Sequence, residues 1–362
     1  MTLAQAAVLR QPGETPRVEE IRLRDPGPHQ VRVRLAATGV CHSDYSLAKG
    51  ILVQTFPTVL GHEGAGTVVA TGEGSRLHEG DDVVLNWTPA CRACWFCTHG
   101  EPYLCERATE ASRQPYATTA DDTDVFPGLG VAAFATETVI DDNACVTVPD
   151  GTSLEQAALL GCAVLTGMGA VRNTGNVRAG ESVAVIGLGG IGLSAVQGAS
   201  IAGAAPIIAI DPSGVRRERA QRLGATHVLD PSAELARSVR ALTDGRGVDC
   251  AVECVGTGET IRATWSMTRR GGRAVVVGMG AKTDAVSFNA LEIAHFARSL
   301  TGCMYGSSDP DRDIPQLLEL MRARRLDVDA LVSARITLEQ LPEAFDELAS
   351  GRGVRSLVVF GS

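Results

Sequence analysis

Four cysteines follow one another closely in a segment that also contains turn residues. They occur in the spacing C-x2-C-x2-C-x7-C, at Cys91, Cys94, Cys97 and Cys105. In a reducing compartment, clustered thiols are more often metal ligands or catalytic groups than disulfides. Four thiolates satisfy a tetrahedral zinc ion and leave no position for water, so the spacing predicts a structural zinc site. An iron–sulfur cluster is the alternative, although the spacing fits neither of the common ferredoxin patterns.

Four thiolates around one Zn²⁺ ion carry a net negative charge. We therefore expect backbone N–H groups or an arginine beside the sulfurs. Arg92 and Arg107 are the arginines near the four cysteines in the sequence.

A glycine-rich turn joins two apolar runs further along the chain. Residues 183–186 are apolar and lead into Gly187-x-Gly189-x-x-Gly192, and a second apolar run, 207–210, ends at Asp211. This is the pattern of strand, turn, helix and strand that binds a dinucleotide, with the pyrophosphate at the helix N-terminus and the acid on the ribose hydroxyls. Because a carboxylate repels a 2′-phosphate, Asp211 favours NAD over NADP. An ordinary glycine-rich turn between strand and helix is the alternative.

Other candidate donors lie at separate points of the first half of the chain. Cys41, His42, Ser43 and Asp44 follow an apolar run, His62 and Glu63 lie between glycines, and Cys162 follows a glycine. Taken singly, these residues also fit structural roles: a buried thiol for Cys41, a surface turn for His62 and a small core residue for Cys162.

The elements that must position these residues fall into two patterns. Residues 1–40 form short alternating runs separated by Pro and Gly, which predicts β-rich structure. From 183 to 277, strands alternate with helices, which predicts a doubly wound parallel sheet with an apolar edge strand at 299–305 that pairs with a second copy. Residues 106–127 are polar and lack periodicity, so we expect a surface loop, and a continuous helical stretch is expected from Ser153 to Ala170.

The composition limits the classes of function. With 362 residues, 44% of them hydrophobic and 21% charged, the chain is long enough for two globular domains. A net charge of −9 argues against nucleic acid and anionic membrane surfaces as partners. No segment has the apolar length of a signal peptide or a membrane span, so we expect a cytoplasmic protein.

Over nearly its full length the sequence resembles the zinc-containing medium-chain alcohol dehydrogenases. The motifs are GVCHSD, GHEGAG, the four-cysteine spacing, LLGC ahead of TG, and GLGGIG with IAID. The resemblance implies an α/β fold with a GroES-like β-rich catalytic domain at 1–163 and a doubly wound Rossmann domain for NAD at 164–305. Residues 306–362 are expected to return to the catalytic domain.

The resemblance also assigns roles to residues of the two sites. It implies two zinc ions per chain, one structural and one catalytic, the latter held by Cys41, His62 and Cys162. Glu63 matches the acid behind the metal, Asp44 the carboxylate that orients His62, and Ser43 the hydroxyl that passes the substrate proton onward. The family often continues this relay through a histidine at the position of Ser46, where this chain departs from the pattern. Trp87 is expected to line the substrate pocket, and the residues expected at NAD are His42, Thr166, Gly187, Gly189, Gly190, Ile191, Gly192, Asp211, Arg216, Val277 and Arg355.

The resemblance implies NAD-linked interconversion of primary alcohols, including aryl alcohols, and aldehydes by hydride transfer. The alternative substrate is a thiol adduct such as S-hydroxymethyl mycothiol, because VVLNWTPAC and GLGVAAFA look similar to that branch as well as to the aryl-alcohol branch. A zinc-free reductase of the same superfamily and a non-catalytic NAD-binding protein are disfavoured, since the Cys–His–Cys set is intact. We expect a small-molecule substrate and a homodimer or homotetramer.

Overall fold

The computed structural model describes residues 2–351 and 353–361, and the chain divides into two compact units. Unit 1 comprises Met1–Ala163, Asp309–Arg322 and Val332–Ser362, and unit 2 comprises Val164–Ser308 and Ala323–Leu331. Residues 306–308 and 323–331 thus belong to unit 2, whereas the resemblance implied that all of 306–362 returns to the catalytic domain. The side-chain amide of Gln197 accounts for part of the difference, because it exchanges hydrogen bonds of 3.0 and 2.8 Å with the backbone of Asp327.

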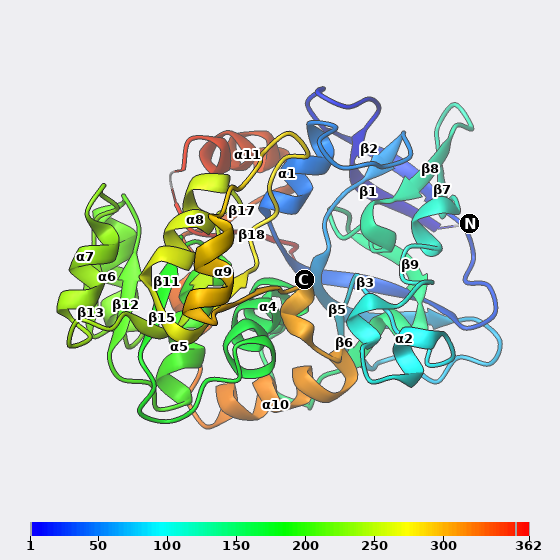
Figure 1. Ribbon diagram of the computed structural model, residues 1–362. Coiled ribbons are helices and arrows are strands. Elements are labelled where there is room, and N and C mark those ends of the chain that lie inside the picture. Colours follow the sequence, from blue (N-terminus) through cyan, green and yellow to red (C-terminus); the bar gives the residue numbers. More distant parts are fainter. Residues whose placement is uncertain (1, 352, 362) are drawn as a thin grey trace. The chain divides into compact units, whose positions relative to one another are not determined.

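Unit 1 contains a small closed barrel and a mixed sheet of seven strands (Figure 1). The two-residue periodicity of its longest strand shows how the core forms. Val31, Val33 and Leu35 are buried while Arg32 and Arg34 alternate with them, so one face of that strand covers the core. The barrel is β1 (Thr2–Leu9), β2 (Arg17–Leu23), β7 (Ala117–Thr119), β8 (Asp124–Pro127) and β4 (Thr58–Val59). The sheet is β10 (Cys145–Thr147), β6 (Asp82–Leu85), β5 (Glu63–Thr71), β3 (Gln30–Gly39), β18 (Ser356–Val359) and β17 (Ala334–Ile336), with β9 (Glu137–Asp141) paired to β3.

The segment 106–127 is not the structureless loop expected from its polarity. Strands β7 and β8 pair with each other in the register Ala117 to Val125, and β7 also pairs with β2. Tyr116, Ala117 and Val125 are buried and anchor the segment in the barrel core. Strands of three and four residues are too short for an alternating pattern to stand out in the sequence.

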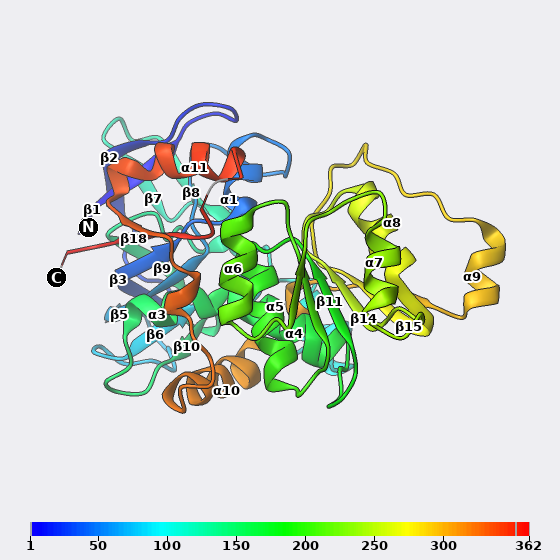
Figure 2. The ribbon, with the colours of Figure 1, turned by 90° about the vertical axis from the view of Figure 1, so that its left-hand side faces the viewer.

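The described part of unit 1 contains five α-helices. Helix α1 packs against α11 through an edge-on contact of Tyr45 with Phe345, whose ring centroids are 6.2 Å apart. Both views show these two helices side by side (Figures 1 and 2). Their bounds are α1 His42–Ala48, α2 Trp95–Thr98, α3 Leu154–Ala158, α10 Pro310–Arg322 and α11 Leu341–Ala349.

The helical stretch expected from Ser153 to Ala170 is broken at Cys162. A 3₁₀ turn, Leu159–Gly161, follows α3, Cys162 has φ −147° and ψ −74°, and helix α4 runs from Ala163 to Gly169. No single helix in the described part of the chain is long and apolar enough to cross a membrane. The bent pair Leu154–Gly161 and Ala163–Thr174, with 55° between its parts, meets that test by length and composition only.

Unit 2 is a six-stranded sheet in which all neighbouring strands are parallel, as predicted. Helices α5 and α6 lie on one face of the sheet and α7 and α8 on the other (Figure 2). The direction in which successive strands are added to the sheet reverses beside β11, which is the arrangement of doubly wound dinucleotide-binding folds. In spatial order the strands are β13 (His227–Leu229), β12 (Ile207–Ile210), β11 (Val183–Ile186), β14 (Val248–Glu253), β15 (Thr268–Val276) and β16 (Ser299–Gly302). The helices are α5 (Gly190–Ile201), α6 (Gly214–Arg222), α7 (Leu235–Ala241), α8 (Gly258–Met267) and α9 (Ala290–Phe296).

Strand β16 forms one edge of the parallel sheet. It ends at Gly302, earlier than the predicted 305, because Tyr305 belongs to a 3₁₀ turn. All four residues of β16 are exposed, and only one side of the strand is paired, to β15. Whether a second copy pairs with this edge stays a prediction.

Candidate zinc centres and cofactor cradle

Four metal-ligating side chains meet in the interior of unit 1. The donor atoms of Cys41, His62, Glu63 and Cys162 all lie within 4.8 Å of one another, and the four residues are buried. Cys41 precedes helix α1, His62 and Glu63 lie at the start of β5, and Cys162 occupies the helix break. The fold therefore brings together the three predicted catalytic ligands and the predicted acid.

Asp44 holds two of these segments in place. Its Oδ1 accepts hydrogen bonds from the Gly61 N–H and from Nδ1 of His62, both at 2.9 Å, and its Oδ2 accepts from the Cys41 N–H at 3.2 Å. Because the Asp44 carboxylate is an acceptor, the proton of neutral His62 is on Nδ1. Nε2 is buried and has no hydrogen-bond partner in the described part of the chain. A lone pair in that position fits a metal ion.

The two sulfurs of this cluster influence each other. Contact with Cys162 lowers the pKa of Cys41 well below its usual range, against the effect of burial, and the charge of Arg355 adds to the lowering. The same contact, together with burial, raises the pKa of Cys162. Ionisation of one thiol of the pair is therefore favoured, and ionisation of the second is disfavoured. A divalent metal ion would stabilise both as thiolates.

Glu63 and Arg355 form a buried ion pair behind the sulfurs. Oε1 of Glu63 accepts the Ala163 N–H at 3.0 Å, and Oε2 lies 3.5 Å from Nη1 of Arg355, which also donates to the Val40 carbonyl at 2.9 Å. Burial raises the pKa of Glu63 to about 7, although Arg355 opposes the shift. Oε1 therefore has a hydrogen-bond partner, whereas Oε2 faces Arg355 as an ion pair but accepts no hydrogen bond from the described residues. Arg355 was expected at a pyrophosphate; the structure places it against Glu63, and the pyrophosphate contact stays a prediction.

Two further predicted residues lie beside the cluster in unit 1. The hydroxyl of Ser43 lies 3.9 Å from the Cys41 sulfur. The Trp87 ring stands edge-on to His62 with 6.2 Å between ring centroids, next to the cluster as expected for a pocket wall. His42, by contrast, is exposed at the first position of α1.

The second cluster contains the four closely spaced cysteines, whose sulfurs also lie within 4.8 Å of one another. The Cys91 and Cys97 sulfurs are 4.0 Å apart, and those of Cys94 and Cys105 are 3.9 Å apart. A tetrahedron with Zn–S bonds of about 2.3 Å has edges of about 3.8 Å, whereas disulfide sulfurs lie about 2.05 Å apart. The geometry fits one metal ion and leaves too little room for a cluster of several irons.

Backbone N–H groups, rather than arginines, face these sulfurs. The N–H of Cys91 lies 3.3 Å from the Cys105 sulfur and that of Cys94 lies 3.3 Å from the Cys91 sulfur. Hydrogen bonds from the backbone at Cys97 and Glu106 lower the pKa of Cys94 to about 6.

The two arginines expected beside the thiolates bind carboxylates. Arg92 pairs with Asp309 at 2.7 Å and with Asp311 at 2.6 Å, which ties the cysteine segment to the start of α10. Arg107 pairs with Glu110 at 3.0 Å. Glu110 first, and the charges of Cys91 and Cys105 in addition, raise the pKa of Arg107, so this arginine still compensates part of the sulfur charge as expected, whereas Arg92 is paired with Asp309 and Asp311.

The glycine turn of unit 2 has the geometry of a dinucleotide cradle. Gly187 has φ +86°, which glycine adopts without strain. A Cβ on Gly192 would lie 1.8 Å from the Gly187 carbonyl oxygen, so only glycine allows α5 to start this close to the turn. Gly189 is the N-cap residue of α5, and a Cβ there would meet nothing within 4 Å, which leaves space above the helix N-terminus.

Asp211 has a second task that the sequence did not indicate. It directly follows β12 and is buried, with Oδ2 accepting the Leu188 N–H and Oδ1 accepting the Ser213 N–H, both at 2.8 Å. Arg216 lies 3.7 Å from Oδ2. The carboxylate therefore fastens the glycine turn and keeps remaining acceptor capacity for a ribose.

The other residues expected at NAD lie within unit 2. Gly190 and Ile191 open helix α5, and Val277 follows β15 at the carboxyl edge of the sheet. Thr166 is buried within α4. Their contact with a cofactor stays a prediction.

The fold and the buried donors define a two-unit zinc-binding dehydrogenase. The family model described as alcohol dehydrogenase GroES-like domain matches residues 27–150, and the one described as zinc-binding dehydrogenase matches residues 190–323. The chain belongs to the zinc-containing medium-chain dehydrogenase family. The predicted fold class, a GroES-like domain with a parallel-sheet Rossmann domain, is confirmed.

Several relatives match over almost the entire chain. The NDMA-dependent alcohol dehydrogenase of Amycolatopsis methanolica is 35% identical over 98% of this chain and 98% of its own. An alcohol dehydrogenase zinc-binding domain protein of Burkholderia ambifaria superposes with a TM-score of 0.95 at 32% identity, and benzyl alcohol dehydrogenase of Acinetobacter calcoaceticus with 0.93 at 28%. Both structures cover 100% of each chain.

Proposed function

We propose that the protein is a zinc-dependent, NAD-linked alcohol dehydrogenase that interconverts primary alcohols, including aryl alcohols, and aldehydes. The observation that carries the proposal is the buried, unpartnered Nε2 of His62 beside the thiols of Cys41 and Cys162. Two sulfurs and one imidazole nitrogen are a catalytic zinc set that leaves a fourth position open. Oε1 of Glu63 accepts the Ala163 N–H and Oε2 faces Arg355 at 3.5 Å, although it accepts no hydrogen bond from the described residues; we assign this acid a place behind the metal and not the fourth ligand position.

Each residue of the cluster has a separate task in the proposed reaction. Zinc, when bound, would polarise the substrate oxygen and lower its pKa. Cys41, His62 and Cys162 would hold the metal, and Asp44 fixes the tautomer of His62. Ser43 is close enough to the ligands to accept the proton of the substrate hydroxyl and pass it on.

The choice of NAD rests on Asp211. Its position at the end of β12, beside the glycine turn, is where a ribose hydroxyl acceptor is needed, and its charge disfavours a 2′-phosphate. The name of the Amycolatopsis relative refers to dependence on NDMA. NDMA therefore belongs among the acceptors to be compared with NAD and NADP.

The test combines metal analysis with a substrate panel. Purified protein is expected to contain two zinc ions per chain and to reduce NAD with benzyl alcohol or another primary alcohol. Formaldehyde with mycothiol tests the thiol-adduct alternative in the same assay. Cys162→Ser should lose one zinc ion and the activity, while Cys145→Ser, a buried cysteine of unit 1 outside both clusters, serves as the matched control. Full activity of metal-free protein would refute the proposal.

A further inference from the structure

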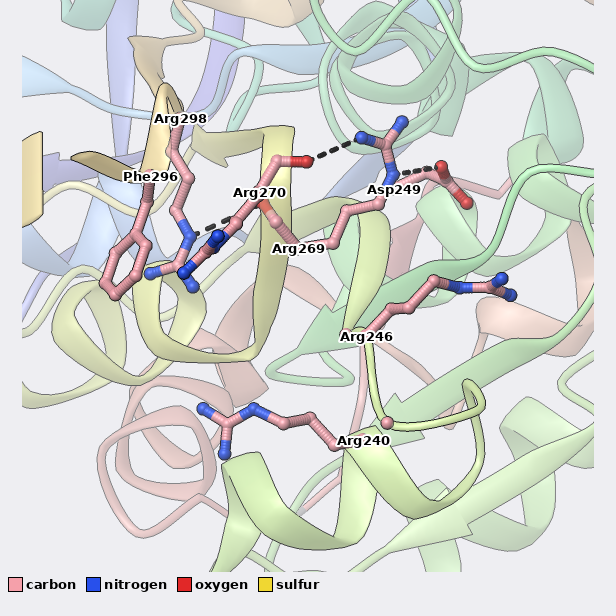
Figure 3. A pocket seen from close by; sticks show the side chains of 9 residues that line it. Arg240, Arg246, Asp249, Arg269, Arg270, Phe296 and Arg298 are labelled. Carbon is pink, nitrogen blue, oxygen red and sulfur yellow. Dashed lines mark hydrogen bonds and ion pairs between the residues drawn. The ribbon is translucent and has the colours of Figure 1, made fainter. Parts of the chain in front are cut away.

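A cavity of about 710 Å³ opens at the amino-terminal edge of the parallel sheet in unit 2. Its walls come from α7, from the starts of β14 and β15, and from the residues just before β16 (Figure 3). We call it the arginine pocket, after the charged residues that line it: Arg240, Arg246, Asp249, Arg269, Arg270 and Arg298. The glycine turn follows the carboxyl end of β11, so the arginine pocket lies at the opposite edge of the sheet.

The arginine pocket has a charge opposite to that of the whole chain. Five guanidinium groups and one carboxylate line it, whereas the chain has a net charge of −9. Among the described residues, two of the five arginines have a carboxylate partner: Arg269 with Asp249 at 2.6 Å, and Arg246 with the exposed Asp244 at 3.0 Å. The positive charge in the pocket is therefore only partly compensated by the protein.

The other three guanidinium groups form no ion pair with a carboxylate of the described residues. Arg240 donates to the Ser266 carbonyl at 3.2 Å, Arg298 to the Arg269 carbonyl at 3.4 Å, and Arg270 contacts Nε2 of His295 at 3.1 Å. These neighbours are neutral acceptors or an imidazole. Each guanidinium retains N–H donors that could bind an anion.

A further carboxylate that acts on Arg298, on α9, is already engaged. Glu292 accepts from Arg262 at 2.8 Å and from the Trp265 indole at 3.2 Å. It therefore offsets only part of the positive charge in the pocket.

The arginines are also held in position. The guanidinium carbons of Arg298 and Arg270 lie 4.5 and 5.5 Å from the centre of the Phe296 ring, and Figure 3 shows both side chains beside it. The pairing of β14 with β15 is irregular between Val248 and Cys250, and such irregularities redirect side chains at sheet edges. Burial and the charges of Arg240, Arg262 and Arg270 lower the pKa of Arg298, an effect that Glu292 only partly offsets. Like charges are thus kept close together, and an anion between them would relieve their repulsion.

We propose that the arginine pocket binds a small polyanion, a molecule with two or more phosphate or carboxylate groups, at a site separate from that proposed for NAD. Guanidinium groups bind both kinds of group in bidentate fashion. The cavity is of the size that holds small-molecule ligands. A monovalent anion would leave most of the positive charge uncompensated, so at least two anionic groups are required.

Isothermal titration calorimetry with inorganic tripolyphosphate and with citrate tests the proposal. Comparison of the two probes distinguishes recognition of phosphate groups from recognition of carboxylate groups. We expect saturable binding of at least one probe that weakens as KCl is added. Arg270→Gln and Arg240→Gln should each weaken that binding by about tenfold or more, as expected for a lost hydrogen bond between charged groups. Arg237→Gln is the matched control, because Arg237 is also on α7 but exposed, outside the pocket and paired with Glu234 at 3.3 Å.

Two results would overturn the proposal. One is the absence of binding by both probes at low ionic strength. The other is binding that Arg270→Gln and Arg240→Gln leave unchanged, since the anion would then occupy the glycine turn or another surface. Melting temperatures identify any variant that fails to fold. If Arg270→Gln or Arg240→Gln fails to fold, Arg270→Glu is measured in its place, because Arg270 is exposed and its side chain can change without loss of core packing.

Discussion

Oδ1 of Asp44 lies 2.9 Å from Nδ1 of His62, and both side chains are almost completely buried. The same carboxylate also receives the N–H groups of Cys41 and Gly61. Two chain segments that each carry a proposed zinc ligand are thus positioned by one acid. The first prediction tests that dependence.

Asp44→Asn should weaken zinc at the Cys41, His62 and Cys162 site by about 10- to 100-fold, the usual cost of losing the group that orients a ligand. The new side-chain amide would place its NH₂ group opposite one of the N–H donors that the carboxylate now accepts from, at Cys41, Gly61 or His62, and that hydrogen bond would be lost. Zinc retained during titration with a chelator is the measurement, and the four-cysteine site is the internal control. Equal retention at both sites in the variant and the wild type would contradict this role.

Cys97→Ser should remove the other zinc ion and leave the first in place. The four cysteines lie in the same segment as Arg92, and Arg92 holds that segment against Asp309. Loss of the metal should therefore destabilise unit 1. We expect one zinc per chain and a melting temperature lower by at least about 2 to 4 °C, the shift that 1 kcal/mol produces in a domain of this size. Cys145→Ser, a buried cysteine outside the cluster, is the comparison for the loss of a thiol alone. Unchanged zinc content would show that these sulfurs do not hold a metal.

Ser43→Ala should reduce kcat by about 10²- to 10⁴-fold, the range for a lost proton-transfer group. Its hydroxyl lies 3.9 Å from the Cys41 sulfur, whereas Ser46 is one turn further along α1. Ser46→Ala should therefore change little, and Ser46→His should raise turnover near pH 7 if proton release limits the rate. The measurement is kcat against pH for the three variants. A large loss in Ser46→Ala with Ser43→Ala almost unaffected would reverse the proposed order.

Asp211→Gly should weaken NAD binding by ~1 to 3 kcal/mol through loss of the ribose hydrogen bonds, and should improve NADP. The structure adds a second effect, because the Leu188 N–H of the glycine turn loses its acceptor. Asp211→Asn separates the contributions, since the amide removes the charge but keeps one acceptor oxygen. Dissociation constants for both cofactors are the readout, and a wild-type preference for NADP would contradict the assignment.

Light scattering at micromolar concentration should give a dimer or a tetramer. The four residues of β16 are exposed along an unpaired edge, and such edges tend to pair with another chain. Leu300→Asp should shift the mass toward the monomer, because Leu300 is an exposed apolar residue of that strand. Leu3→Asp, another exposed leucine, on β1, is the control. A monomeric wild type would exclude pairing of this edge.

The sequence alone determined the sites whose residues lie close together along the chain. The four-cysteine spacing brings its sulfurs together within one local segment, and the glycine turn requires only the strand before it and the helix after it. The alternation of strands and helices between 183 and 277 likewise predicted the parallel sheet, since hydrophobic periodicity is visible inside each element. For Cys41, His62 and Cys162, the residues themselves left structural roles open, and the resemblance to a family joined them.

Only the tertiary structure decided which distant groups meet. Residue types do not reveal that Arg355 pairs with Glu63, that Asp211 fastens the glycine turn, or that Cys162 lies at a helix break. The barrel strands β7 and β8 were too short to show a period, and packing against β2 gave them their structure. The arginine pocket has the same origin: its charges come from separate elements, and the parallel sheet brings the amino ends of neighbouring strands to one edge.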